Sequence, residues 1–378
     1  MAEKRAIFED VGAAGQTAAP QGGMIDRGRR GARGAIRVWL MVLFTLVVIM
    51  ICVGGLTRLT DSGLSITEWK PVTGAWPPMG DAAWQQEFDK YQAIPEFKIQ
   101  NKWMELSDFK AIFWWEWSHR QLGRVIGLVW AFGFLFFWLT KRIPPGWTGR
   151  LVLVGALGGV QGAVGWWMVS SGLVGSMTDV ANYRLATHLG LAFITLGFIA
   201  WFVFKLGREE RDLMQARRMR ETRLFGVGTG WMHLVFLQIL LGALVAGIDA
   251  GTAFTDWPLM NGQILPPDPF SMEPVWSNFF ENPALVQFVH RCVGYLVGLY
   301  AIMAWLKGRK SANRSTRAAF SLAALGVAVQ VALGIYTLML GAEWQIAIVH
   351  QLGAVAIWVL ILRARFVAAY PLTQSIRG

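Results

Sequence analysis

Eight long apolar runs constrain this chain more than any other feature of its sequence. They lie near residues 36–57, 119–140, 150–170, 185–206, 224–248, 285–306, 317–340 and 344–366. Each is long enough to cross a bilayer, which takes about 20 residues of helix. Only 16% of the 378 residues are charged, against about 25% in soluble domains. The sequence therefore predicts an all-α integral membrane protein with eight transmembrane helices.

The basic residues predict how these helices are oriented in the lipid bilayer. With the loops on alternate sides, 25 of the 35 Lys and Arg residues fall on the side of the two termini. The loop 249–284, on the other side, carries five acidic residues and no Lys or Arg. The positive-inside rule then places both termini in the cytoplasm and the loops 58–118 and 249–284 outside. The net charge of +11 is thus an orientation signal, and no nucleic-acid partner is expected.

Short motifs recur in the same order in the two parts of the chain, which indicates an internal repeat. The paired motifs are His119-Arg120-x-x-Gly123 with His290-Arg291-x-x-Gly294, His188-Leu189-Gly190 with His350-Gln351-Leu352-Gly353, Asp61-x-Gly63 with Asp249-x-Gly251, Glu68-Trp69 with Asp256-Trp257, and Gln161 with Gln330. An even number of spans in each part gives both parts the same orientation. The sequence therefore predicts two tandem four-helix bundles related by a parallel internal repeat.

The repeat divides the chain into two halves joined by a linker. The predicted segments are a disordered cytoplasmic tail (1–35), an N-terminal four-helix half (36–206), a basic cytoplasmic linker (207–223), a C-terminal four-helix half (224–366) and a cytoplasmic tail (367–378). The two cysteines, Cys52 and Cys292, fall within predicted spans. The outer loops therefore contain no thiol that could form a disulfide or a redox dithiol.

Four of the five histidines lie near the outer ends of even-numbered spans, one on each: His119, His188, His290 and His350. An ionisable side chain within a span is costly, so such a residue suggests a function. Facing helices that each carry one histidine can ligate a haem from both sides. Zinc fits less well, because no Cys, Asp or Glu recurs beside each pair. Interfacial histidines that bond to the backbone or to headgroups are the alternative.

The residues next to these histidines add a second kind of chemistry. Arg120 and Arg291 directly follow two of the histidines and could pair with haem propionates or act as interfacial anchors. Glu116 stands three residues before His119, on the same helix face, whereas the corresponding residue in the second half is Gln287. The first half alone therefore carries an acid that could serve proton chemistry. A solvated carboxylate at the outer end of the span is the alternative.

These motifs resemble a known family. Glu116-x-x-His119-Arg120 with His188, and His290-Arg291 with His350, are similar to the haem A synthases of cytochrome oxidase assembly. Without cysteine pairs in its outer loops, the chain resembles the proteobacterial and mitochondrial class. The resemblance implies an oxidoreductase of the bacterial inner membrane. Its reaction would convert the C8 methyl of haem O, through a hydroxymethyl intermediate, to the formyl group of haem A.

The resemblance also implies roles for individual residues. The iron of the substrate haem O would be held by His119 and His188, with Arg120 beside them. A haem b cofactor would take His290 and His350 as axial ligands of its iron, with Arg291 beside them, and Glu116 would be catalytic. Further implied partners are haem O synthase, oxidase assembly factors and an electron acceptor that the sequence does not identify.

Two other classes of protein remain as alternatives. A bis-histidine dihaem cytochrome b would carry similar ligands, but would usually place its haems on opposite sides of the bilayer, whereas all four histidines here share one depth. A transporter with parallel repeats gains less support, because no acid or broken helix pair marks a site at the bilayer midplane.

Overall fold

Eight long helices make up most of the protein, which a computed structural model describes for residues 24–372. They are α1 (Met24–Leu59), α4 (Leu106–Leu139), α5 (Thr148–Gly172), α6 (Asn182–Leu206), α8 (Thr222–Gly247), α11 (Pro283–Gly308), α12 (Arg314–Met339) and α13 (Trp344–Ala369). Each contains a segment long and apolar enough to cross a membrane, and the described range contains no β-strand. The predicted all-α membrane protein with eight spans is confirmed.

The predicted boundaries hold within a few residues except at two helices. Helix α4 begins at Leu106 rather than at residue 119, and a capping box between Glu105 and Asp108 closes its first turn. His119 and Glu116 therefore lie inside a long helix and not at its outer end. Residues 24–35, assigned to the N-terminal tail by the sequence, belong to α1, and the rest of that predicted tail lies outside the described residues.

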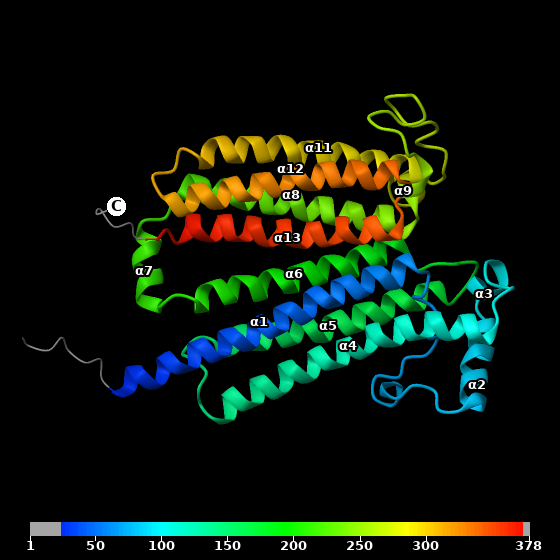
Figure 1. Ribbon diagram of the computed structural model, residues 1–378, viewed down its shortest axis with the longest axis horizontal. Helices are drawn as coiled ribbons and strands as arrows, with labels where there is room; N and C mark the ends of the chain where they lie inside the picture. The colour runs from blue at the N-terminus through cyan, green and yellow to red at the C-terminus, as the bar shows by residue number, and fades with distance from the viewer. Residues whose placement is uncertain (1–23, 373–378) are drawn as a thin grey trace, which may run out of the picture.

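The helices are arranged as two groups of four, side by side (Figure 1). Helices α1, α4, α5 and α6 form one group, here called the first half, and α8, α11, α12 and α13 form the second half. Within each half every helix contacts two others, and the halves meet where α6 packs on α8 and α13 and where α1 packs on α13. The two-fold relation between the halves stays a prediction.

The centre of the assembly is α6, which lies between its own half and the second one. Phe193 of α6 and Phe236 of α8 both pack against the ring of Trp358 of α13, and Gly197 of α6 allows this indole to approach the helix backbone. Few residues of α4 and α5 are buried by contrast, and exposed apolar residues such as Phe132 suit contact with lipid.

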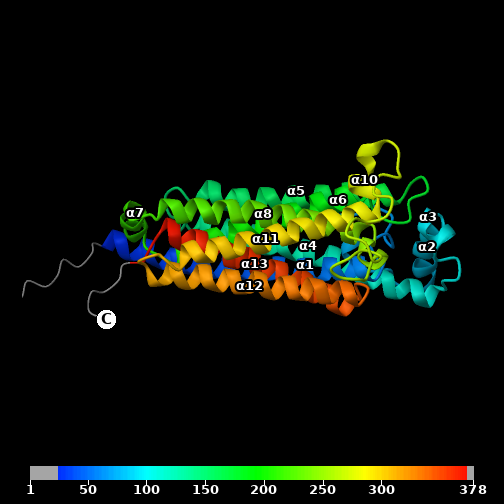
Figure 2. The ribbon, with the colours of Figure 1, turned by 90° about the horizontal axis from the view of Figure 1, so that it is seen from above.

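Two long loops lie at one end of the bundle, which we call the loop end (Figures 1 and 2). The first, after α1, includes α2 (Asp81–Gln92) and α3 (Pro95–Ile99), and the second, after α8, includes α9 (Ala250–Ala253) and α10 (Asn278–Glu281). The short helix α7 (Glu210–Arg218) lies at the opposite end, where α1 begins and α13 ends. The predicted linker 207–223 is therefore partly helical.

Candidate functional site

Each of the four histidines on the even spans is packed against a glycine of a neighbouring helix. A Cβ atom added to these glycines would lie only 2.8–3.2 Å from Cε1 of the imidazole, so that a larger residue would displace the ring. The pairs are His119 of α4 with Gly54 of α1, His188 of α6 with Gly165 of α5, His290 of α11 with Gly242 of α8, and His350 of α13 with Gly334 of α12.

The two histidines of each half interact electrostatically with each other. His119 is close enough to His188 for their charges to interact, and the same holds for His290 and His350. All four side chains are partly exposed. No cluster of three or more His, Cys, Asp or Glu residues able to hold a metal ion occurs between residues 24 and 372. Two imidazoles from two helices fit a haem iron.

Three glutamines contact these histidines. Nε2 of Gln161, Gln238 and Gln330 donates to the backbone carbonyl of the neighbouring histidine at 3.0, 3.0 and 2.7 Å, and lies 3.2, 3.1 and 3.1 Å from the Nδ1 atom of its ring. Sequence reasoning found Gln161 and Gln330 but missed Gln238. The signal that would have found it is Gln-x-x-x-Gly, which occurs in three of the four odd-numbered spans and ends at the glycine beneath the imidazole.

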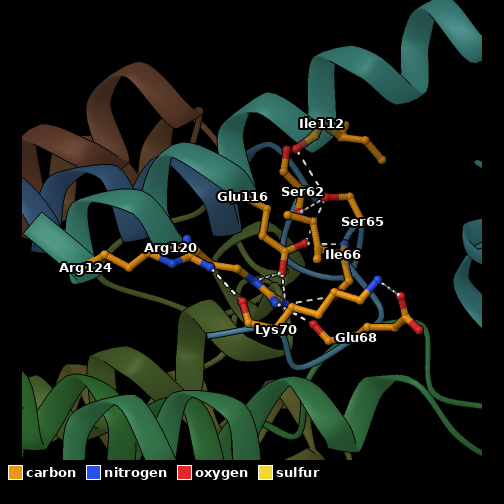
Figure 3. A network of polar contacts seen from close by, with 9 residues as sticks. All are labelled: Ser62, Ser65, Ile66, Glu68, Lys70, Ile112, Glu116, Arg120 and Arg124. Carbon is orange, nitrogen blue, oxygen red and sulfur yellow. Dashed lines mark hydrogen bonds and ion pairs between the residues drawn. The ribbon is translucent and has the colours of Figure 1, made fainter. Parts of the chain in front are cut away.

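Glu116 is a buried carboxylate whose two oxygen atoms are both hydrogen-bonded (Figure 3). Oε2 accepts from the Ser65 hydroxyl at 2.8 Å and from the Ile66 N–H at 2.7 Å. Oε1 accepts from Nε and Nη2 of Arg120 at 2.9 and 2.6 Å. Only 3% of the residue is exposed, so the alternative of a solvated surface carboxylate is wrong. Glu116 lies one helical turn from His119, as its spacing predicts.

The two arginines that follow histidines hold the loops at the loop end in place. Arg120 donates to the carbonyl groups of Ile66 and Glu68 at 2.7 and 3.0 Å. Arg291 makes the corresponding contacts in the second half, to the carbonyl groups of Phe254, Asp256 and Leu259 at 3.1, 3.0 and 2.9 Å. Contact of either arginine with a haem propionate stays a prediction.

Gln287 occupies the position of Glu116 in the second half and is buried as deeply, at 2% exposed. Its Nε2 donates to the carbonyl groups of Ala250 and Phe254 at 2.7 and 3.1 Å. Its oxygen accepts from Arg291 at 3.0 Å. At this position the second half therefore has a neutral amide with hydrogen-bond partners, whereas the first half has an ion pair.

The first loop carries one further buried acid near Glu116, which is Glu96. Burial, together with the charges of Asp179 and Asp61, raises the pKa of Glu96 to about 8. Burial also raises the pKa of Asp61 and of Asp179, although Arg58 opposes the shift in both. In the second loop, by contrast, the acid Asp256 is partly exposed, and the backbone N–H groups of Gly262 and Asn261 lower its pKa. The two buried acids of the described residues, Glu96 and Glu116, therefore both belong to the first half.

Comparison with known proteins gives one family match and several close relatives. Residues 37–362 match the COX15-CtaA family, described as cytochrome oxidase assembly protein. The chain is 66% identical to the heme A synthase of Ruegeria pomeroyi and 60% identical to that of Roseobacter denitrificans, each over 100% of both chains. It is 58% identical to the heme A synthase of Paracoccus denitrificans over 99% of both. The matched residues include all four paired histidines and Glu116.

Proposed function

The chain belongs to the COX15-CtaA family of cytochrome oxidase assembly proteins, and from this premise we propose that it acts as a haem A synthase. It oxidises the C8 methyl group of haem O, through a hydroxymethyl intermediate, to the formyl group of haem A. The observation that carries this proposal is the asymmetry between two similar histidine pairs, of which only the first adjoins a buried acid, Glu116. A dihaem electron carrier would need two ligand pairs but has no task for this carboxylate.

We assign one histidine pair to the substrate and the other pair to the cofactor. His119 and His188 would hold the haem O substrate in the first half, and His290 and His350 would hold a haem b in the second half. Both assignments are supported by two partly exposed histidines in each half, which lie on different helices and interact electrostatically with each other. When bound, haem b supplies a redox centre that can receive electrons from the oxidation.

Glu116 is the group that we assign to proton transfer. Oxidation of a methyl carbon releases protons as well as electrons, and a carboxylate near the substrate can accept them or position water. The Ser65 hydroxyl that donates to Glu116 also lies 3.2 Å from the Ser62 carbonyl and 3.4 Å from the Ile112 carbonyl (Figure 3). It can therefore turn to either carbonyl when Oε2 takes up a proton. Arg120 remains on Oε1 and keeps the carboxyl group oriented.

The setting of this reaction is a multi-pass membrane protein, which we place in the bacterial inner membrane with both termini in the cytoplasm. The excess of basic residues on the side of the termini supports this orientation. A reporter fused after Gly378 should be active only in the cytoplasm, and one inserted near Pro267 only outside; a cytoplasmic signal near Pro267 would refute the orientation.

Haem O synthase and oxidase assembly factors are the proposed partners.

Pigment extraction tests the proposed function. The protein is expressed in a host that makes haem O but no haem A, and the extracted haems are separated by chromatography. A haem A synthase yields haem A and the hydroxymethyl intermediate together with haem b. Recovery of haem O and haem b alone would contradict the proposal and favour an electron carrier.

A further inference from the structure

The odd-numbered spans carry one more pattern around the histidines, and the first half breaks it. In three of these spans a glutamine precedes the glycine beneath the imidazole by four residues, and its amide contacts the histidine. In α1 the corresponding residue, four before Gly54, is Met50. Met50 cannot donate a hydrogen bond, since its thioether is only a weak acceptor.

Met50 stands in the same place relative to its neighbouring helix as Gln238 does. A Cβ atom added to Gly123, four residues after His119, would lie 3.3 Å from Cε of Met50. One added to Gly294, four residues after His290, would lie 3.3 Å from Nε2 of Gln238. The methionine therefore replaces a glutamine at an equivalent position.

The consequence is seen on the imidazole itself. Nδ1 of His119 is buried and has no hydrogen-bond partner, whereas Nδ1 of His188, His290 and His350 each lies within 3.2 Å of a glutamine amide nitrogen. Of these four rings, His119 alone lacks a polar partner among the residues that the structure describes.

A polar partner matters because of how a histidine binds iron. The ligating ring uses one nitrogen for the metal and donates the N–H of the other to an acceptor, which fixes the ring and raises its basicity. The glutamines can fix the ring by their position: Nε2 of each lies beside the imidazole and donates to the backbone carbonyl of the same histidine, whereas Oε1 of Gln161 and of Gln238 is buried without a partner and accepts nothing from the ring. Loss of such a partner typically weakens metal binding by about 10–100-fold.

From these contacts, and resting on the proposed function, we infer that His119 is the exchangeable ligand of the substrate site. His188, supported by Gln161, holds the iron of the incoming haem, and the bond to His119 forms and breaks as substrate enters and product leaves. His290 and His350, each supported by a glutamine, retain haem b through many turnovers. Met50 is thus a positioning residue: because its side chain carries no amide, His119 lacks the contact that the other three histidines have.

The test exchanges the two residues. Met50→Gln supplies the missing amide to His119, and Gln238→Met removes it from His290; both side chains are unbranched and good helix formers. Met50→Leu is the matched control, because it changes the side chain without adding a hydrogen-bonding group. Purified protein is mixed with excess apomyoglobin, and the transfer rates of haem O and haem b are followed separately by extraction. Low-spin ferric haem signals are recorded alongside by electron paramagnetic resonance.

Met50→Gln should slow the release of haem O by about 10-fold or more and shift its low-spin signal, while haem b is unaffected. Gln238→Met should speed the release of haem b, and Met50→Leu should behave like the wild type. Unchanged haem O release in Met50→Gln, in a protein that still makes haem A, would overturn this inference and leave the proposed function standing. A wild-type protein that makes no haem A would instead refute the proposed function.

Discussion

In both halves an arginine that follows a histidine makes similar contacts with a loop, but the residue beside this arginine differs. In each half an arginine after a histidine binds the carbonyl groups of the loop that follows the first helix of that half. The same arginine meets Glu116 in the first half and Gln287 in the second. The arginine of the first half therefore contacts an acid, and the arginine of the second half contacts a neutral amide.

A second difference between the halves concerns the residue that donates to Glu116. Ser65 donates to Glu116, and the residue 188 positions later is Ala253. The Ser62 carbonyl, which lies 3.2 Å from the Ser65 hydroxyl, corresponds to the Ala250 carbonyl that accepts from Gln287. Two substitutions should therefore convert the acid site of the first half into the neutral site of the second.

The double variant Glu116→Gln/Ser65→Ala makes this conversion and carries the largest expected effect. The new amide can donate to the freed Ser62 carbonyl and accept from Arg120, but it loses the hydrogen bond from the Ile66 N–H. We therefore expect a less stable protein that still folds and keeps its haem b. Loss of the carboxylate should lower the rate of haem A formation by about 10²–10⁴-fold, the usual contribution of a general base. The measurement is the time course of haem A in cell extracts.

The single variant Ser65→Ala is the control for this conversion. It retains the Glu116 carboxylate, so the difference between the two variants reports the acid itself. A double variant that forms haem A at the rate of the single variant would remove Glu116 from the chemistry.

Replacement of Arg120 should destabilise the protein more than replacement of Arg291. Arg120→Ala leaves the buried Glu116 without its ion-pair partner, which typically costs about 3–5 kcal/mol. Arg291→Ala leaves the neutral Gln287, and an unsatisfied neutral group costs about 1–3 kcal/mol. Thermal unfolding in detergent should therefore show the larger loss for Arg120→Ala, and a smaller one when Glu116→Gln is added to it. Equal losses in both halves would argue that the arginines act only through the loop carbonyl groups.

The smallest expected effect concerns the pH dependence of stability, set by the first loop. Because the pKa of Glu96 is raised to about 8, the folded protein binds a proton there that the unfolded chain releases at lower pH. This contribution is present at acidic pH and is lost as pH rises toward 8. Glu96→Gln should therefore flatten the decline of melting temperature between about pH 4.5 and pH 8. The control is Asp256→Asn in the second loop, where the pKa of the acid is lowered and no change in this range is expected. An unaltered decline in Glu96→Gln would place its origin elsewhere.

The sequence predicts the eight spans because runs of about 20 apolar residues are typical of membrane-spanning helices and rare in soluble domains. It misses the first turns of α4, where Asp108, Lys110 and Glu116 interrupt the apolar run. Hydropathy averages over such a segment, whereas the capping box of Glu105 and Asp108 starts a helix by local hydrogen bonds.

The candidate site is predicted in its residues but not in its contacts. Spacing along one helix places Glu116 beside His119 and also, at four residues, beside Arg120. Burial of Glu116 depends on Ser65 and Ile66, which lie about fifty residues away in the chain, and no local pattern encodes such a contact. Gln238 was missed for a related reason, since its partner motif in α1 contains a methionine.

Haem content after removal of each histidine tests the division of labour between the halves most directly. The variants His119→Ala, His188→Ala, His290→Ala and His350→Ala are purified from a host that makes haem O, and their haems are extracted and quantified. We predict that the last two lose haem b, and that the first two keep haem b but lose haem O and haem A. Equal loss of haem b from all four variants would contradict this division.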